Sequence, residues 1–242
     1  MATRHTRGRS TRALIAGLFA LEACAGQRFG PWSRGPARAT PSHQTLAIVR
    51  VRTPWYAPNF VVRSRFRDAV PEYEALAALD AKYFILTEDG RFGGIYLWSS
   101  RRDATEFYSD TWRRDIRARR GSDPDLRLFD VASVTEGEAR PEGDHVGARS
   151  LAYRAHATLL LWPRAGGPTL ETLSNPAMDA PGMIRSITVH DDAHVGVVSL
   201  WATRELGQTA LGSARWSALG PPETRAWFEA PVLLDAGVRS RR

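Results

Sequence analysis

The chain has 242 residues and a mass of 26.8 kDa, with 43% hydrophobic and 24% charged residues. This composition is typical of a globular protein with a sizeable core, and it excludes a mainly disordered chain and a polytopic membrane protein. The pI of about 10.3 invites a nucleic-acid interpretation. The positive charge, however, lies in residues 1–38 and in the last four residues, so the body between them has a net charge of −2. No nucleic-acid partner is therefore expected, because such a body would concentrate positive charge against phosphates.

The N-terminus has the pattern of an export signal. Residues 1–12 carry four arginines and no acid, and the short apolar run Ala13–Leu21 follows. This order of basic and apolar segments is typical of a secretory signal, and nine apolar residues are too few for a permanent transmembrane helix. We expect a signal peptide over residues 1–23 and a flexible tether over 24–45, which is rich in Gly, Pro, Ser and Arg.

Cys24 is the only cysteine, so no intramolecular disulfide is expected. It lies where a bacterial lipoprotein carries its lipidated cysteine, and Leu21-Glu-Ala-Cys24 resembles a lipobox, although Glu22 departs from that pattern. Lipidation at Cys24 predicts a cell-envelope protein whose contact with the membrane is made through a lipid anchor alone. A secreted protein without the lipid, or a cytoplasmic protein with a disordered leader, are the alternatives.

The body contains an internal repeat. Residues 82–102 match residues 185–205 at a constant offset of 103, and the match continues with an offset of 99 after a short deletion. Such self-similarity indicates two copies of one structural unit. The matched pairs are Gly93 with Gly196, Leu97 with Leu200, Trp98 with Trp201, Arg101 with Arg204, Gly121 with Gly220, Phe129 with Phe228, and Asp130 with Glu229.

The first copy predicts two helices and four strands in chain order. A β-branched strand comes first, then an amphipathic helix, a hairpin of two strands, a second helix and a closing strand. Gly90 suits the hairpin turn, Ser100 can cap the second helix and Gly121 can end it. The expected bounds are a strand over 46–53, a helix over 59–76, strands over 81–87 and 92–99, a helix over 101–120 and a strand over 126–134.

The second copy predicts the same order. Its expected strands lie near 153–162, 183–190, 194–202 and 224–234, its second helix covers 204–219, and its first helix is short, between Pro168 and Pro181. The acidic stretch between the copies is expected to be a linker.

These patterns predict an α+β fold in which a tandem duplication of ferredoxin-like β-α-β-β-α-β units forms an intrachain α+β barrel. We expect a monomer with an internal pseudo-dimer, with a homodimer as the alternative. The expected domains are a first unit over 46–135, a linker over 136–150, a second, degenerate unit over 151–236 and a basic tail over 237–242.

The stretch Phe92-Gly-Gly-Ile-Tyr-Leu-Trp-Ser-Ser100, followed by Ala104, a helix with Trp112, Gly121 and Leu128-Phe-Asp-Val131, resembles the YdhR-like monooxygenases. These belong to the dimeric α+β barrel superfamily, alongside the antibiotic-biosynthesis monooxygenases. The segments Arg52–Pro58 and Lys82–Phe84 are also similar to that group. The resemblance covers residues 46–134 well and residues 152–235 weakly, through the repeat and through Phe228–Val232.

The resemblance implies a cofactor-independent monooxygenase-like enzyme that acts on an aromatic or otherwise oxidisable small molecule. In such an enzyme the substrate anion itself gives an electron to dioxygen, so the site needs an aromatic slot and hydrogen bonds that favour the anion. We expect Tyr96 and Arg63 to be catalytic and the aromatic residues near them to bind substrate, all in one cavity between the sheet and the helices of the first copy. The substrate-binding candidates are Trp55, Tyr56, Tyr83 and Trp98.

The first copy is the expected site because the repeat places Ser199 where the first copy has Tyr96, and Ser186 where it has Tyr83. No cofactor is expected. Haem is an alternative without support, since the helix that holds histidine in haem-degrading relatives has none here. The stretch His190-Asp-Asp-Ala-His194 invites a metal interpretation but is expected to be a solvated hairpin turn. The alternative function is a non-catalytic envelope lipoprotein that binds a small molecule or serves as a scaffold.

Overall fold

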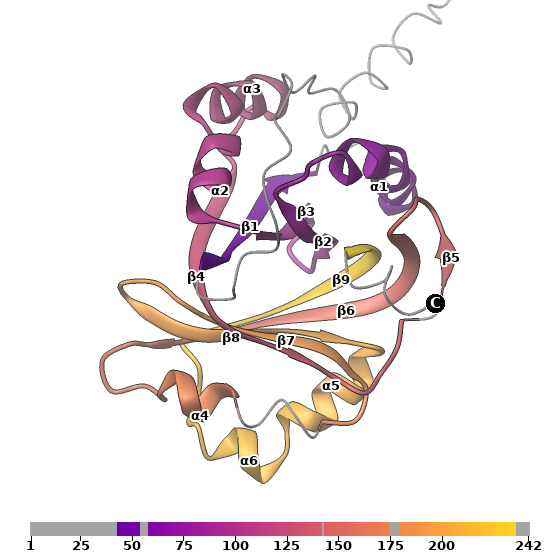
Figure 1. Ribbon diagram of the computed structural model, residues 1–242. Helices are drawn as coiled ribbons and strands as arrows, with labels where there is room; N and C mark the ends of the chain where they lie inside the picture. Colours follow the sequence, from indigo (N-terminus) through magenta and orange to yellow (C-terminus); the bar gives the residue numbers. More distant parts are fainter. Residues whose placement is uncertain (1–42, 54–57, 142, 175–179, 236–242) are drawn as a thin grey trace, which may run out of the picture.

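The computed structural model describes residues 43–53, 58–141, 143–174 and 180–235. It contains strands and helices in the order expected from the sequence, with one additional short strand and with two of the expected helices divided (Figure 1). The strands are β1 (Thr45–Arg52), β2 (Leu79–Thr87), β3 (Arg91–Trp98), β4 (Asp125–Glu136), β5 (Asp144–His145), β6 (Ser150–Pro163), β7 (Met183–His190), β8 (His194–Trp201) and β9 (Thr224–Asp235). The helices are α1 (Asn59–Glu74), α2 (Arg101–Phe107), α3 (Asp110–Arg120), α4 (Leu170–Ser174), α5 (Arg204–Leu211) and α6 (Ala214–Ser217).

Eight of these strands close into one antiparallel barrel. Their order is β6-β8-β7-β4-β1-β3-β2-β9, and a further pairing of β9 with β6 completes the ring. The short strand β5 pairs with the start of β6, outside the ring. The predicted α+β barrel within one chain is therefore confirmed.

The first half of the chain (β1 to β4) and the second half (β6 to β9) meet at two seams. At one seam β4 pairs with β7, and at the other β2 pairs with β9. Within the first half the strand order is β4-β1-β3-β2, and within the second it is β9-β6-β8-β7. The two halves thus use their strands in the same spatial order and share one interior.

Alternation along the strands separates the barrel interior from two outer layers. In β3, Ile95 and Leu97 point into the interior cluster, whereas Tyr96 and Trp98 point outward. The helices α1, α2 and α3 cover the outer face of the first half, and α4, α5 and α6 cover that of the second (Figure 1). The chain consequently has three apolar layers, one inside the barrel and one beneath each group of helices.

Two helices predicted as continuous are each split. The segment 101–120 forms α2 and α3 because Ser109 begins a new helix, its side chain accepting a hydrogen bond from the backbone N–H of Trp112 at 3.3 Å. The segment 204–219 forms α5 and α6.

The expected linker is also partly ordered. The β5 strand lies within it, and the carboxylate of Glu74 accepts hydrogen bonds from the backbone N–H groups of Ala148 and Arg149 at 3.0 and 2.8 Å. These bonds tie the linker to the end of α1.

The predicted signal peptide, the lipidation at Cys24 and the basic tail lie outside the described residues. Within the described part of the chain, no helix is long and apolar enough to cross a membrane.

Candidate functional site

The strongest candidate site is the outer apolar layer of the first half, beneath α1, α2 and α3. Its floor is the β2–β3 hairpin, where Lys82 is paired directly opposite Tyr96. The turn of this hairpin contains Gly90 at φ +74°, a conformation that favours glycine. Lys82 and Tyr96 point to the same outer face, and both are buried, with 2% and 5% of their surfaces exposed.

The helices add aromatic side chains that cover this floor. Tyr73 comes from α1, Tyr108 from the junction between α2 and α3, and Trp112 from the first turn of α3. The ring centroids of Tyr96 and Tyr108 lie 5.8 Å apart, and those of Tyr96 and Tyr73 lie 5.9 Å apart. Trp98 stacks on Tyr96 with an interplanar angle of 11°. These rings form a continuous group, which we call the aromatic layer.

The amino group of Lys82 lies inside the aromatic layer. Its Nζ atom is 2.8 Å from the ring centroid of Tyr73, 3.8 Å from that of Phe84 and 4.6 Å from that of Tyr96. Ring faces attract cations, so this geometry offsets part of the cost of removing an ammonium group from water. A buried lysine among rings can attract the negative charge of an aromatic anion.

Gly94 makes room for this arrangement. A Cβ atom at this position would lie 2.8 Å from Cε2 of Tyr96 and 3.2 Å from Cε of Lys82. A larger residue would therefore displace the two side chains that define the floor. The backbone of Gly94 lies in an ordinary strand, so its conformation does not require glycine. Close packing against Tyr96 and Lys82 does.

Two buried hydrogen-bond donors of the aromatic layer lack a normal partner. The indole Nε1 of Trp98 and the hydroxyl of Tyr108 have no hydrogen bond of acceptable geometry among the described residues. Burial raises the pKa of Tyr108 well above its usual range, and the proximity of Tyr96 adds to the shift. The nearby indole N–H of Trp98 opposes it, although its alignment with the phenol oxygen falls short of a regular hydrogen bond. Tyr108 therefore stays protonated at neutral pH and can donate its hydrogen.

A buried amino group, two donors and several ring faces together suit one kind of ligand. Such a site can stack a planar aromatic molecule and favour its anionic form.

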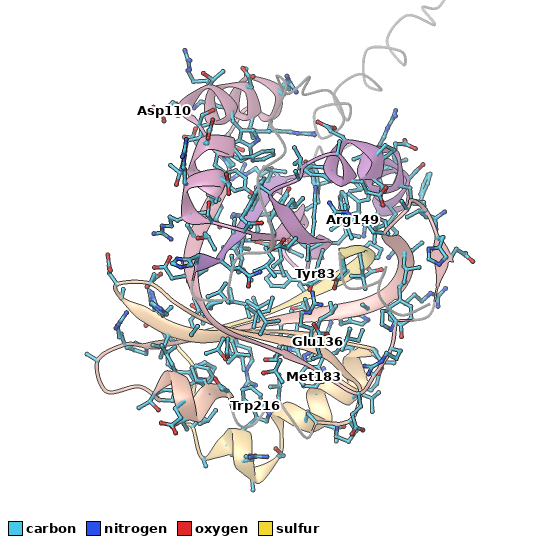
Figure 2. All side chains as sticks on the ribbon, viewed as in Figure 1. Tyr83, Asp110, Glu136, Arg149, Met183 and Trp216 are labelled. Atoms are coloured by element: carbon cyan, nitrogen blue, oxygen red, sulfur yellow. The ribbon has the colours of Figure 1, made fainter. Side chains whose placement is uncertain are left out.

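The structure brings only part of the predicted site together. Tyr96 and Trp98 lie side by side in the aromatic layer. Tyr83 points in the opposite direction, into the barrel interior, because it is one residue away from Lys82 along β2 (Figure 2). Arg63 lies on the solvent side of α1, where it forms a salt bridge of 2.7 Å with Glu229. The prediction of one shared cavity is therefore wrong for Tyr83 and Arg63. Trp55 and Tyr56 lie outside the described residues.

The comparison between the two hairpins also needs a correction. Lys82 pairs with Tyr96 in the first hairpin, and Ser186 pairs with Ser199 in the second. Ser186 therefore occupies the place of Lys82, and Ile187 occupies the place of Tyr83. The chemical difference between the halves is thus larger than predicted, because a lysine–tyrosine pair faces the helices in one half and a serine–serine pair in the other.

Sequence reasoning missed Lys82. It is the only lysine among the 33 basic residues Lys and Arg, and it lies at an outward position of a buried strand. The sequence does contain a signal for this site. Lys82 lies within the otherwise apolar and aromatic run Ala81–Leu86, and a lysine on a buried strand is rare enough to indicate a special role.

The stretch 190–194 forms the turn between β7 and β8, as expected. Oδ1 of Asp191 accepts hydrogen bonds from the backbone N–H groups of Ala193 and His194 at 2.9 and 2.7 Å, which closes the turn. These backbone bonds lower the pKa of Asp191 even though burial acts to raise it.

No family model matches the chain, and no curated protein matches it. Solved structures do resemble it. A "putative monooxygenase" from Fusobacterium nucleatum has a TM-score of 0.56 at 8% identity, over 81% of this chain and 95% of that one. An anthrone oxidase-like protein has a TM-score of 0.50 at 14% identity, over 81% and 94% of the two chains.

These similarities show the fold. The chain has the mixed α+β barrel of monooxygenase-like proteins, and the identity is too low to carry an activity across.

Proposed function

We propose that the protein is a cofactor-independent, monooxygenase-like enzyme that oxidises an aromatic or otherwise oxidisable small molecule in the aromatic layer of its first half. The observation that carries the proposal is the amino group of Lys82, 2.8 Å from the ring centroid of Tyr73 and 4.6 Å from that of Tyr96. The barrel fold, shared with the "putative monooxygenase" and the anthrone oxidase-like protein, supports it at the level of fold alone.

In this mechanism the substrate supplies all the electrons. A methylene group between aromatic rings loses a proton, and the resulting anion transfers an electron to dioxygen. Overall the CH₂ group and O₂ become C=O and H₂O, so that no external reductant is consumed. Lys82 in its charged form would stabilise the anion, and the hydrogens of Trp98 and Tyr108 would be donated to its oxygen.

Binding requires a rearrangement of the layer. The rings of Tyr108, Trp98 and Trp112 contact one another, with centroids 5.9 and 5.0 Å apart around Tyr108. A substrate ring would replace one of these contacts, and the break between α2 and α3 at Tyr108 and Ser109 is the natural place for the helices to move apart.

The second candidate function is a non-catalytic binding or scaffold protein. The observation that favours it is the same close packing of rings, which resembles an ordinary core.

We infer as well that the two halves are a tandem duplication of ferredoxin-like units, and that the first is YdhR-like. The equal strand orders, β4-β1-β3-β2 and β9-β6-β8-β7, support the duplication. The second half would then serve as a built-in dimerisation partner.

The test uses anthrone as substrate, with oxygen uptake and quinone absorbance as readouts and no cofactor added. We expect the wild type to consume oxygen faster than buffer and Lys82→Met to lose at least about tenfold of this rate, since one charge-assisted contact contributes about 1.5–3 kcal/mol. Met fills a similar volume without a charge, so the melting temperature of Lys82→Met should not fall.

Ser186→Ala, at the matching position of the second half, is the control and should keep the wild-type rate. Quenching of tryptophan fluorescence by anthrone without oxygen uptake would support the binding protein instead. If anthrone is neither bound nor oxidised, the proposal for this site is overturned.

A further inference from the structure

A groove of about 550 Å³ lies on the other side of α1 from the aromatic layer. It is lined by α1, the start of β5, the first part of β6 and the middle of β9. Its volume falls within the range of small-molecule sites, which is about 300–1,000 Å³. The proposed oxidation does not use this groove. Val62 and Phe66 of α1 pack with the aromatic layer, to which Tyr73 belongs, whereas Arg63 and Arg67 of the same helix line the groove.

Irregular pairing of β6 and β9 shapes the floor of the groove. Ala152 pairs with Val232 and Ala155 pairs with Ala230, so Tyr153 and Arg154 together face Pro231 alone. This bulge turns two consecutive residues out of the regular ladder, and proline has no N–H to offer them. The floor presents the half-buried apolar surfaces of Ala152 and Pro231, and Val232 beneath them is 1% exposed.

Positive charge dominates the walls. Arg63 is neutralised by Glu229, to which it donates a hydrogen bond of 2.7 Å. Arg67 lies one turn further along α1, and Arg154 projects from the bulge; within the described part of the chain neither makes a salt bridge. Asp144 at the rim is the other carboxylate of the lining, so the groove carries three guanidinium groups against two carboxylates.

We propose that this groove binds a small organic carboxylate, with its carboxylate held by Arg67 and Arg154 and its apolar body on the floor. Guanidinium groups present paired N–H donors that match the two oxygens of a carboxylate. A single negative charge balances the excess of one positive charge in the lining. The apolar floor gives an organic anion an advantage over an inorganic one, because burial of its body removes apolar surface from water.

The test is a binding titration of the full chain by calorimetry, with benzoate as the probe. We expect benzoate to bind the wild type and to bind the double variant Arg67→Gln/Arg154→Gln at least about tenfold more weakly, since tenfold corresponds to about 1.4 kcal/mol. The matched control Arg102→Gln/Arg119→Gln removes the same charge from exposed positions of α2 and α3 and should retain wild-type affinity. Benzyl alcohol, which lacks the charge, should not bind.

Each remaining outcome decides the matter. Equal affinity of benzoate for the wild type and for the groove variant, or no binding to the wild type, overturns the proposal. Inorganic phosphate that binds as tightly as benzoate overturns the role of the apolar floor. Benzoate binding lost in Lys82→Met but kept in the groove variant would place benzoate in the aromatic layer, and would thus refute the groove without touching the proposed oxidation.

Discussion

Arg185 donates a hydrogen bond of 2.9 Å from Nη1 to the phenol oxygen of Tyr83 inside the barrel. The two residues belong to β7 and β2, which are separated by three strands in the sheet order, so the bond crosses the interior. The same guanidinium group forms salt bridges of 2.6 Å with Glu136 of β4 and with Asp235 of β9. One side chain of the second half thereby contacts strands on both seams.

Arg185→Ala is expected to lower the free energy of unfolding by about 2–4 kcal/mol, because it removes the buried hydrogen bond to Tyr83 and the salt bridges to the largely buried Asp235 and the exposed Glu136. The control is Arg101→Ala, which breaks a half-exposed salt bridge of 3.4 Å with Asp130 and should cost less than about 1 kcal/mol. Urea unfolding of the three proteins measures both changes. Equal losses for the two variants would show that the interior contacts of Arg185 contribute no more than a surface pair.

We expect the buried Tyr83 to make the free energy of unfolding fall at alkaline pH. Burial raises its pKa to about 12, although the charge and hydrogen bond of Arg185 act in the opposite direction. The folded protein thus keeps the proton that the unfolded chain releases at the ordinary pKa of 10.0. The raised pKa of Tyr83 therefore stabilises the folded state fully below pH 10, and this stabilisation is lost as the pH rises from about 10 to about 12. The loss in the free energy of unfolding is about 1.4 kcal/mol for each unit by which the pKa is raised.

The pKa of Tyr108 is also raised, so both residues contribute to the way the wild-type free energy of unfolding changes with pH. Tyr83→Phe isolates the first, because phenylalanine does not titrate. We expect the variant to lose less stability than the wild type over this pH range in chemical denaturation. Two parallel curves would contradict the assignment.

Gly94→Ala is expected to destabilise the protein by about 1–3 kcal/mol, since the new methyl group overlaps the ring of Tyr96 at 2.8 Å. It should also change the near-UV circular dichroism of the aromatic layer. Gly212→Ala is the control, where the nearest atom to a Cβ, the backbone oxygen of Gln208, is 3.3 Å away and the predicted change is below about 0.5 kcal/mol. A Gly94→Ala variant as stable as the control would mean that the layer has room for a methyl group.

The strands and the barrel could be predicted from the sequence because their signals are local. Alternation in residues such as Ile95 and Tyr96 marks the two faces of β3, and the repeat indicates two equal sets of strands. Ser100 caps α2 and Gly121 ends α3 at φ +69°, both as expected. These features depend on a few neighbouring residues and on no distant contact.

The candidate site was harder to predict because it depends on register. Five residues separate the pair Leu86 and Phe92 across the first hairpin, but four separate His190 and Val195 across the second. A constant offset between the copies therefore assigns the wrong partner to every residue of one strand. Because the first hairpin turn is one residue longer, Lys82, and not Tyr83, lies among the rings beneath the helices.

The position of β9 in the ring has a consequence for how the chain reaches its native state. The last strand pairs with β2 on one side and with β6 on the other, joining Ala81 to Asp235 across most of the described sequence. Until residues 224–235 are available, β2 and β6 both have unpaired edges, and the interior between them is open to water. Contacts between residues so far apart in the sequence slow folding. A nascent or truncated chain that ends before β9 forms an open sheet with exposed strand edges and exposed apolar surface, and is therefore prone to aggregation.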